Sequence, residues 1–572
     1  MAYTTKLLFV FSSIVMLLIS ACYIAYRYEG NVFKDEVDES NGILQAHQYK
    51  QTGWESENIL SNSDETRRVS ISNSRDRKQL TTEKPSSWVI HINTSGYYNL
   101  TSDILDCTDD AAIYITASNV VLDGCGHVVD GTSGSDSKWG IYVENAENVT
   151  IKNVSISEWY YAGIYFYNSS GFILNNTIQY NDYYGVCLYN SSNNTISNNT
   201  FMDDGIFVYY SYNNIVENNT ADGKPLVYME NVNNAQINWS TGQIVLVRCE
   251  NITITNQSMQ NIEVGIELWE TNNSEIYNVS MWSTFDVGIC LYFSHGNKIH
   301  NNTIINSWSG GIYISNSTAN KIYDNHIQGS WNVSLFIYGS VGNEIYNNTI
   351  LWNGIGLLLS DSNRNNIYNN TVFGHFADGV LLSYSSNNHI YNNNISQNDH
   401  HGIWLKYSHG NNISSNILEK NLADGVYLQG SQRNYIYNNT IKNNDNGISL
   451  FDSPENDIYN NTIQDNQYYY GIYIQYSSRS NISNNAFINN GLFLKHSYNN
   501  TIENNTVNGK PLIYLENVEN IKIDQSFAEI ILIGCNNITI TGQNITHTDI
   551  AIELWRTNNT KIANNTIQNT DG

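Results

Sequence analysis

The chain has 572 residues, of which 53 are acidic and 27 basic, so its formal charge at pH 7 is −26. Hydrophobic residues make up 41% and only four prolines occur, which excludes a disordered chain and a Pro-rich or collagen-like stalk. The acidity argues against nucleic acid as a partner, because a phosphate backbone is bound by clustered Lys and Arg. Seven cysteines are too few for a disulfide-dense scaffold.

The N-terminus predicts export from the cytoplasm. Residues 7–26 run for 20 positions without a charge, between Lys6 and Arg27. As a helix rising about 1.5 Å per residue, such a run spans a hydrocarbon core of roughly 30 Å. Residues 1–26 are thus an uncleaved signal-anchor or a signal peptide. In the second case the segment ending at Cys22 resembles a lipoprotein box whose Cys becomes lipidated. Either route predicts an extracytoplasmic protein, membrane-anchored or secreted.

Residues 27–86 differ from everything that follows. They hold 9 basic and 11 acidic residues and show no sustained apolar period. Such a composition is typical of a flexible, solvated linker. We therefore expect a charged tether that holds the rest of the chain away from the membrane.

Residues 87–572 repeat one unit. Each unit holds three short apolar segments with period-two alternation, separated by Asn, Ser, Gly and Asp, which are strand and turn signals. A leucine-rich repeat has a similar period but needs a Leu framework and a helical segment. We predict instead an all-β parallel β-helix, a solenoid with three short strands per coil. The repeat is marked by the first Ile of an N-x-I-Y-N-N-T-I phrase, at intervals of 22–24 residues: Ile299, Ile322, Ile345, Ile367, Ile390, Ile413, Ile436, Ile458 and Ile482.

In a parallel β-helix, residues one period apart lie above one another at about 4.8 Å per coil. Stacked Asn amides can then hydrogen-bond from coil to coil, and Asn also tolerates the left-handed backbone of tight turns. A second Asn column, two positions before each Ile, runs from Asn297 to Asn456 and ends at Ser480. The first predicted ladder lies three positions after each Ile: Asn302, Asn325, Asn348, Asn370, Asn393, Asn416, Asn439, Asn461 and Asn485.

An outward column of aromatic residues follows each Ile and allows two interpretations. The rings could stack on one another and cover the strand edges, which is a structural role. Alternatively, outward rings could stack on sugars. The candidates for carbohydrate stacking, which also include two rings of the third strand, are Tyr346, Tyr368, Tyr391, Trp404, Tyr427, Tyr437 and Tyr459.

A larger duplication is present at an offset of 286 residues. Residues 163–281 resemble residues 449–567, and both copies contain the phrase Gly-Lys-Pro-Leu, beginning at Gly223 and Gly509. Each phrase interrupts the regular period, which predicts a loop or a short coil there.

The cysteines allow one disulfide. Cys107 and Cys125 are close enough in sequence to pair across neighbouring coils, and export would permit the bond. The other cysteines of the repeats are expected to be small interior residues: Cys187, Cys249, Cys290 and Cys535.

The repeats resemble the NosD-like family of right-handed β-helix proteins, with carbohydrate-binding and sugar-hydrolase (CASH) repeats, common on archaeal and bacterial surfaces. The resemblance covers about residues 91–570 and rests on the phrase VVLDGCGHVVDG, on the I-x-N-N-T-I coils and on the two Gly-Lys-Pro-Leu blocks. It implies a right-handed, pectin-lyase-like solenoid. It implies no single activity, because this fold hosts lyases, hydrolases, epimerases and non-catalytic scaffolds. The family's named member serves copper delivery.

The chemistry-bearing residues are sparse. Copper delivery needs clusters of His, Met or Cys, whereas the chain has only six Met and scattered His, so we expect no cofactor, with Ca or Cu as the metals to consider. Asp378, His401 and Asp424, 23 residues apart, are the candidate catalytic or metal-binding column. Such a stack could bind a metal or perform acid–base work. The alternative is a solvated turn in which Asp and His merely avoid a like-charge ladder.

We therefore expect a non-catalytic surface scaffold or adhesion rod that binds surface glycans or other surface proteins. The alternatives are a polysaccharide lyase or glycoside hydrolase, and a copper-binding metallochaperone. N-x-S/T sequons in the turns allow glycosylation of an exported chain. The last coil leaves a strand edge open, which allows two interpretations: the rods associate end to end, or the chain is a fragment of a longer protein.

Overall fold

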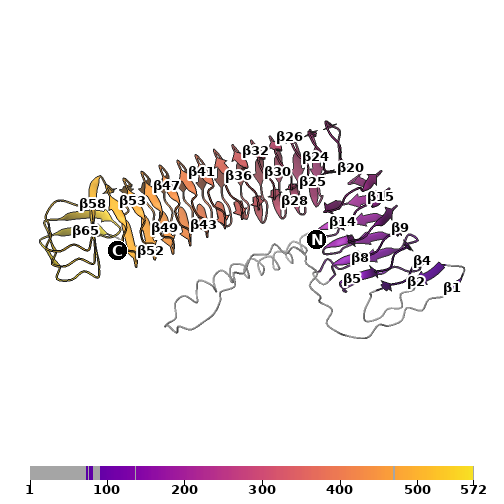
Figure 1. The fold of residues 1–572 in the computed structure, drawn as a ribbon, viewed down its shortest axis with the longest axis horizontal. Helices are drawn as coiled ribbons and strands as arrows, with labels where there is room; N and C mark the ends of the chain where they lie inside the picture. Colours follow the sequence, from indigo (N-terminus) through magenta and orange to yellow (C-terminus); the bar gives the residue numbers. More distant parts are fainter. Residues whose placement is uncertain (1–72, 75–76, 81–89, 135–136, 468–469, 571–572) are drawn as a thin grey trace, which may run out of the picture. The chain divides into compact units, whose positions relative to one another are not determined.

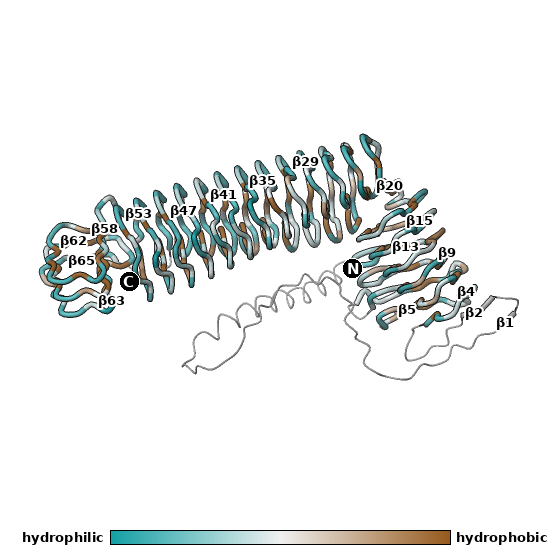
Figure 2. Tube along the Cα trace, viewed as in Figure 1, coloured by the Kyte–Doolittle hydropathy of each residue, from teal (hydrophilic) through white to brown (hydrophobic). Residues whose placement is uncertain are grey.

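A computed structural model describes residues 73–74, 77–80, 90–134, 137–467 and 470–570, which form 65 β-strands and no helix. Each strand of a coil pairs in parallel with the corresponding strand of the next coil (Figure 1). One coil consists of β38 (Asn366–Tyr368), β39 (Thr371–Phe373) and β40 (Val380–Ser383). Hydrophobic and hydrophilic segments alternate around every coil (Figure 2), because successive side chains of a strand point to opposite faces. The predicted parallel β-helix is confirmed.

The predicted register is also confirmed. The nine isoleucines from Ile299 to Ile482 occupy directly paired positions of neighbouring strands, and all are buried. The core is therefore a column of stacked aliphatic side chains. It is bounded by polar columns at the turns.

The first Asn ladder runs unbroken through the predicted positions. Asn370 Nδ2 donates to Asn393 Oδ1 at 3.0 Å, and the same bond joins each of the other eight residues to the next coil. Asn393 Oδ1 also accepts the backbone N–H of Asn370 at 2.9 Å. In an Asn-Asn pair the first residue takes the left-handed backbone, with φ of 57° at Asn369, and the second makes the ladder.

A further interior ladder was missed at the sequence level. It lies at the turn after the second strand of each coil, where backbone N–H groups again donate to the side chain one coil further along. One member is a buried histidine in place of the amide. The ladder consists of Asn353, His375, Asn398, Asn421, Asn444, Asn466 and Asn490.

The solenoid begins before the expected boundary at residue 87. Strand β2 (Arg77–Leu80) pairs in parallel with β4 (Gly96–Leu100), so the expected tether over 27–86 is corrected at its C-terminal end. The predicted anchor or signal over 1–26 and the lipidation of Cys22 lie outside the described residues. Within the described residues, no helix is long and apolar enough to cross a membrane.

The predicted disulfide is wrong. No disulfide joins Cys107 to Cys125. Cys107 points into the core, whereas Cys125 is exposed at a left-handed turn position (φ 52°), so the two side chains face different environments. The four cysteines expected to be interior are buried.

Both Gly-Lys-Pro-Leu phrases form β-hairpins that end one stretch of coils and start another. Strand β19 (Thr220–Ala221) pairs antiparallel with β20 (Lys224–Glu230), and β57 (Thr506–Val507) pairs antiparallel with β58 (Lys510–Glu516). The turn residues Asp222-Gly223 and Asn508-Gly509 all have positive φ, as a two-residue type I′ hairpin requires. The described residues therefore form three solenoid segments joined by two equivalent junctions.

At each junction a sheet ends, so the N–H groups of its last strand have no neighbouring strand to pair with. Buried side chains accept those hydrogen bonds instead. Strand β55 (Leu492–Lys495) ends such a sheet: the N–H of Leu492 donates to the Glu529 carboxyl at 3.1 Å, and the N–H of Leu494 donates to Glu553 at 3.2 Å. The first junction has the same arrangement 286 residues earlier, with Gln243 and Glu267 as acceptors. Burial raises the pKa of Glu529 above its usual range and that of Glu553 to about 8.

Removing one rung of the ladder should destabilise the solenoid. Asn393→Ala deletes donors to Asn416 Oδ1 and Ile367 O and an acceptor for Asn370, and so leaves buried polar groups unpaired. We expect the free energy of unfolding in urea to fall by about 2–4 kcal/mol. The neighbouring exposed residue supplies the control, since Asn394→Ala should change it by less than about 0.5 kcal/mol. Equal losses in both variants would contradict the ladder's role.

The buried junction carboxyls should make stability fall with rising pH. The folded state holds the proton of Glu529 more tightly than the unfolded chain does, so this stabilisation is complete below about pH 4.5 and is lost as the pH rises through the raised folded pKa. The variant Glu529→Gln introduces at the second junction the residue type that the first junction has at the equivalent position, Gln243.

At pH 8 this variant should be more stable than the wild type by on the order of 2 kcal/mol, and near pH 4.5 it should be equal. Urea unfolding at both pH values measures this. Exposed Glu503 supplies the control. If Glu503→Gln showed the same pH-dependent gain in stability as Glu529→Gln, the effect could not be assigned to the buried carboxyl.

Candidate functional site

Asp378, His401 and Asp424 lie in one column, on consecutive coils, in the turns before β40, β43 (Ile403–Lys406) and β46 (Val426–Gln429). All three are buried, so the alternative of a solvated turn is wrong. Asp378 Oδ1 accepts the backbone N–H of His401 at 3.1 Å, and His401 Nδ1 accepts the backbone N–H of Asp424 at 3.1 Å. The column is thus a hydrogen-bond ladder like those of Asn, and the next coil continues it with Asn446, whose amide donates to Asp424 Oδ1 at 2.7 Å.

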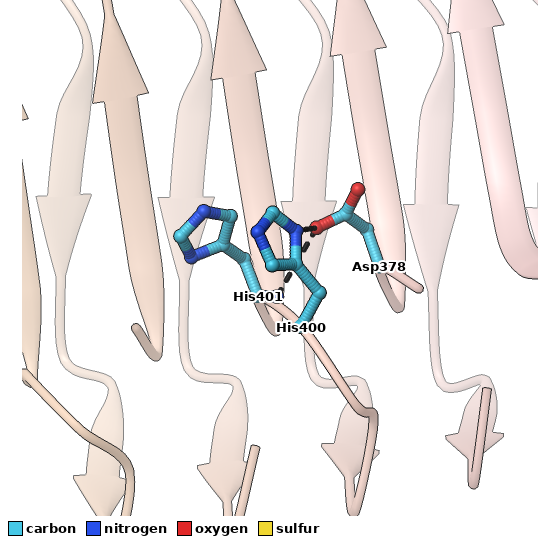
Figure 3. A group of neighbouring side chains, drawn as sticks. All are labelled: Asp378, His400 and His401. Atoms are coloured by element: carbon cyan, nitrogen blue, oxygen red, sulfur yellow. Dashed lines mark hydrogen bonds and ion pairs between the residues drawn. The ribbon is translucent and has the colours of Figure 1, made fainter. Parts of the chain in front are cut away.

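His400 is the residue of this site that sequence reasoning left out of the candidates. Its Nδ1 lies 2.7 Å from Asp378 Oδ1, and its side chain is 45% exposed. Figure 3 shows one oxygen of the Asp378 carboxylate joined by dashed lines to the His400 imidazole and to the His401 backbone. Ligand atoms of Asp378, His400 and His401 all lie within 4.8 Å of one another. The buried ladder therefore presents one solvent-facing histidine held by a carboxylate.

Burial sets the electrostatics of the site. It holds the pKa of His401 well below its usual value, with neighbouring His400 acting in the same direction, so His401 is neutral. Since Nδ1 accepts a backbone N–H, the proton is on Nε2. Burial raises the pKa of Asp424 to about 6, against the hydrogen bond from Asn446 that lowers it. The pKa shifts of His401 and Asp424 thus both follow from burial in the low-dielectric wall, which favours the neutral form of each side chain.

Aromatic rings surround this group on the outer face of the sheet. Trp404 and Tyr427 occupy directly opposed positions of β43 and β46. The Trp404 ring lies 5.8 Å from the His400 ring and 6.0 Å from that of Tyr427, which itself stacks on His401 at 4.6 Å. The Nζ of Lys406 lies 5.5 Å from the Trp404 ring centroid. Of the stacking candidates, these two rings are the ones that gather at the polar group.

The tyrosine column has a different geometry. Tyr346, Tyr368 and Tyr391 stack face to face, with centroids 4.9 Å apart and planes within 6°, and Tyr437 and Tyr459 do the same within 3°. Each inner ring therefore covers the faces of its neighbours. This is the structural arrangement that the sequence suggested as one of two interpretations, and it leaves ring edges toward solvent.

Comparisons with known proteins connect this geometry to a family. Residues 223–378, 371–492 and 467–572 match the model described as "Periplasmic copper-binding protein (NosD)", which thus covers more than half of the chain. The chain belongs to the NosD family. Residues 139–231 match the model described as "Right handed beta helix region", which agrees with the pairing of this NosD-family solenoid. No curated protein matches.

Several solved β-helix structures are similar to this NosD-family chain. The crystal structure of the periplasmic alginate epimerase AlgG has 12% identity over 58% of this chain and 77% of that chain, with a TM-score of 0.36. The A-module of the mannuronan C-5 epimerase AlgE6 from Azotobacter vinelandii has 13% identity over 74% and 90%, with a TM-score of 0.21. Dettilon tailspike protein has 13% identity over 51% and 59%, with a TM-score of 0.26. These likenesses concern the fold and carry nothing about activity.

The NosD description raises the question of copper. Among the described residues, Asp378, His400 and His401 are the one group of His, Cys, Asp or Glu with three ligand atoms close together. Imidazole and carboxylate suit Cu(II) or Zn(II), whereas Cu(I) prefers thiolate and thioether ligands. Asp378 Oδ2 and a nitrogen of His400 could bind such an ion, whereas His401 would have to give up either its Nε2 proton or the hydrogen bond that its Nδ1 accepts from the Asp424 N–H. The donor types fit a divalent ion.

The ladder role of His401 can be separated from its chemistry. His401→Asn supplies the amide acceptor that Asn446 supplies on a later coil, so it should fold with a loss below about 1 kcal/mol. His401→Leu leaves the buried N–H of Asp424 without an acceptor and should cost about 1–3 kcal/mol. Urea unfolding of both variants measures the difference. If leucine were tolerated as well as asparagine, the column would not act as a ladder.

Proposed function

We propose that this NosD-family protein is an extracytoplasmic, non-catalytic β-helix rod that binds polysaccharide on the outer face of the sheet containing β40, β43 and β46. The family description, which names a periplasmic protein, supports the location. An N-terminal anchor over residues 1–26 would hold the rod at the membrane.

The observation that carries the proposal is the combination of Trp404 and Tyr427 with the Asp378–His400 pair on one outer face. A sugar offers apolar ring faces and many hydroxyls, and the site offers aromatic surface beside a carboxylate and an exposed imidazole. The ladder accounts for the burial of Asp378, His401 and Asp424 without any reaction. Binding is therefore the simplest use of the residues that face solvent.

A panel of soluble neutral and acidic polysaccharides tests the proposal, with retardation in affinity electrophoresis as the measurement. We expect at least one polysaccharide to retard the protein, and Trp404→Ala to weaken that binding about tenfold or more. Phe172→Ala, which removes an exposed ring from another sheet, is the matched control and should bind normally. Absence of retardation by every polysaccharide would overturn the proposal.

The 2.7 Å contact between His400 and Asp378 favours one second candidate, a carbohydrate-active enzyme in which the carboxylate orients the imidazole as a general base. Release of reducing ends or of unsaturated products from the same panel would support it. Asp378→Asn is the informative variant, because the amide oxygen can still accept the His401 N–H. Activity in the wild type that this variant loses would replace the non-catalytic rod by an enzyme. A divalent ion bound at the same group would contact His400. Titrating Cu(II) into the protein, with and without prior removal of metal by a chelator, therefore distinguishes a metal-binding role from a catalytic one.

A further inference from the structure

A row of exposed aromatic rings runs along the turns that follow the second strand of each coil. Strands β27 (Ser280–Trp282), β30 (Thr303–Ile305) and β33 (His326–Gln328) precede its first three members. Backbone hydrogen bonds from Trp308 to Thr284, from Trp331 to Ser307 and from Phe376 to Asn353 place the row positions on successive coils. The row consists of Phe285, Trp308, Trp331 and Phe376, which are 38%, 42%, 48% and 69% exposed.

Gly354 occupies the row position between Trp331 and Phe376, and its coil carries Trp352, which is 50% exposed, two residues earlier. The ring of Trp352 leans over Gly374 of the next coil, where a Cβ atom would approach it to 2.6 Å. The apolar surface thus continues through the coil that has no ring in the row.

The rings of this row are open, unlike those of the tyrosine column. Trp308 and Trp331 have centroids 5.7 Å apart and planes 31° apart, and each is nearly half exposed. Contiguous exposed aromatic surface of this kind marks binding sites, and tryptophan is enriched where binding energy concentrates. The row was not predicted from the sequence, because its members stand in turns outside the strand pattern.

The turns that carry the four rings contain no Lys or Arg. The residues directly beside Phe285, Trp308 and Trp331 are Ser, Thr and Asn, together with Asp286, which accepts a hydrogen bond from the Tyr184 hydroxyl of the first solenoid segment at 3.4 Å. The turn of Phe376 also holds His375 and Asp378, and both are buried. Anionic membranes or nucleic acids would need Lys and Arg here. Aromatic faces interleaved with hydroxyls and amides instead fit a neutral glycan chain, whose rings stack and whose hydroxyls hydrogen-bond.

The row leads to the site described above. Phe376 is two residues before Asp378 in the same turn. The next two positions of the row, Asp399 and Leu422, line an open hollow of about 470 Å³ with Gln397 and Lys420. Asp399 directly precedes His400. A chain laid over the row along the coils therefore arrives at the Asp378–His400 group.

We propose that Phe285, Trp308, Trp331 and Phe376 form a track that holds a neutral glycan chain parallel to the solenoid axis and guides it to the Asp378–His400 group. The coil spacing of about 4.8 Å lets successive rings of the track meet successive sugar rings of an extended chain. This track deepens the proposed function by naming its ligand class and the surface that binds it, and it rests on that function.

Isothermal titration with cellohexaose, xylohexaose, mannohexaose, laminarihexaose and chitohexaose tests the track. We expect at least one hexasaccharide to bind the full chain, and Trp308→Ala/Trp331→Ala to raise its Kd about tenfold or more. The matched control is Tyr384→Ala/Tyr407→Ala, which removes two exposed rings stacked 5.3 Å apart on successive coils at another turn. Its Kd should stay within about twofold of the wild-type value. Circular dichroism checks that both variants keep the fold.

The outcomes separate the track from the proposed function. Polysaccharide binding that Trp404→Ala abolishes but Trp308→Ala/Trp331→Ala leaves intact would overturn the track and keep the function. Lack of binding by every hexasaccharide would also overturn the track, whereas the polysaccharide panel decides the function. If the wild type sedimented as a dimer that Trp308→Ala/Trp331→Ala dissociates, the row would be a contact between copies, and the track would be wrong.

Discussion

Each coil of this solenoid must satisfy the buried polar groups of its neighbour. A turn that enters the wall exposes backbone N–H and C=O groups to an apolar interior, where an unpaired group costs about 1–3 kcal/mol. From Asn302 to Asn485 the Asn side chain solves this at each coil: Asn393 accepts from Asn370 and donates to Asn416, with a further bond to the Ile367 carbonyl. The same demand explains why Asp378, His401 and Asp424 can be buried, since they occupy ladder positions.

The demand persists where the stacking stops. At the two hairpin junctions the last strand of a sheet would leave N–H groups unpaired, and side chains of the following segment accept them: Gln243 and Glu267 at the first, Glu529 and Glu553 at the second. The duplication at an offset of 286 residues thus copied a complete junction together with its acceptors. Buried carboxyls that hold their protons are the cost of this solution, and Gln243 shows that an amide serves equally at one of the positions.

The sequence predicted the features that the repeat period determines. Residues 22–24 apart lie in register, so the isoleucine column, both Asn columns and the stacked tyrosines could be read directly. Other features depend on the environment that a side chain meets, which the repeat period does not determine. Cys107 and Cys125 point to different environments, and the adjacent His400 and His401, whose ring centroids lie 3.9 Å apart, differ in exposure, with His401 buried. The hairpins had a readable signal in Asp222-Gly223 and Asn508-Gly509, because Asp-Gly and Asn-Gly are strong two-residue hairpin sequences.

The same ladders that fix the wall also determine what faces solvent. With Asp378 and His401 committed to backbone N–H groups, the outer face offers His400, Trp404, Tyr427 and, along the neighbouring turn, the open rings from Phe285 to Phe376. A crystal structure with a bound neutral oligosaccharide tests this account most directly. Sugar rings should lie over Trp308 and Trp331 and approach the Asp378–His400 group. Sugar bound elsewhere on the solenoid, with those rings and His400 left bare, would contradict it.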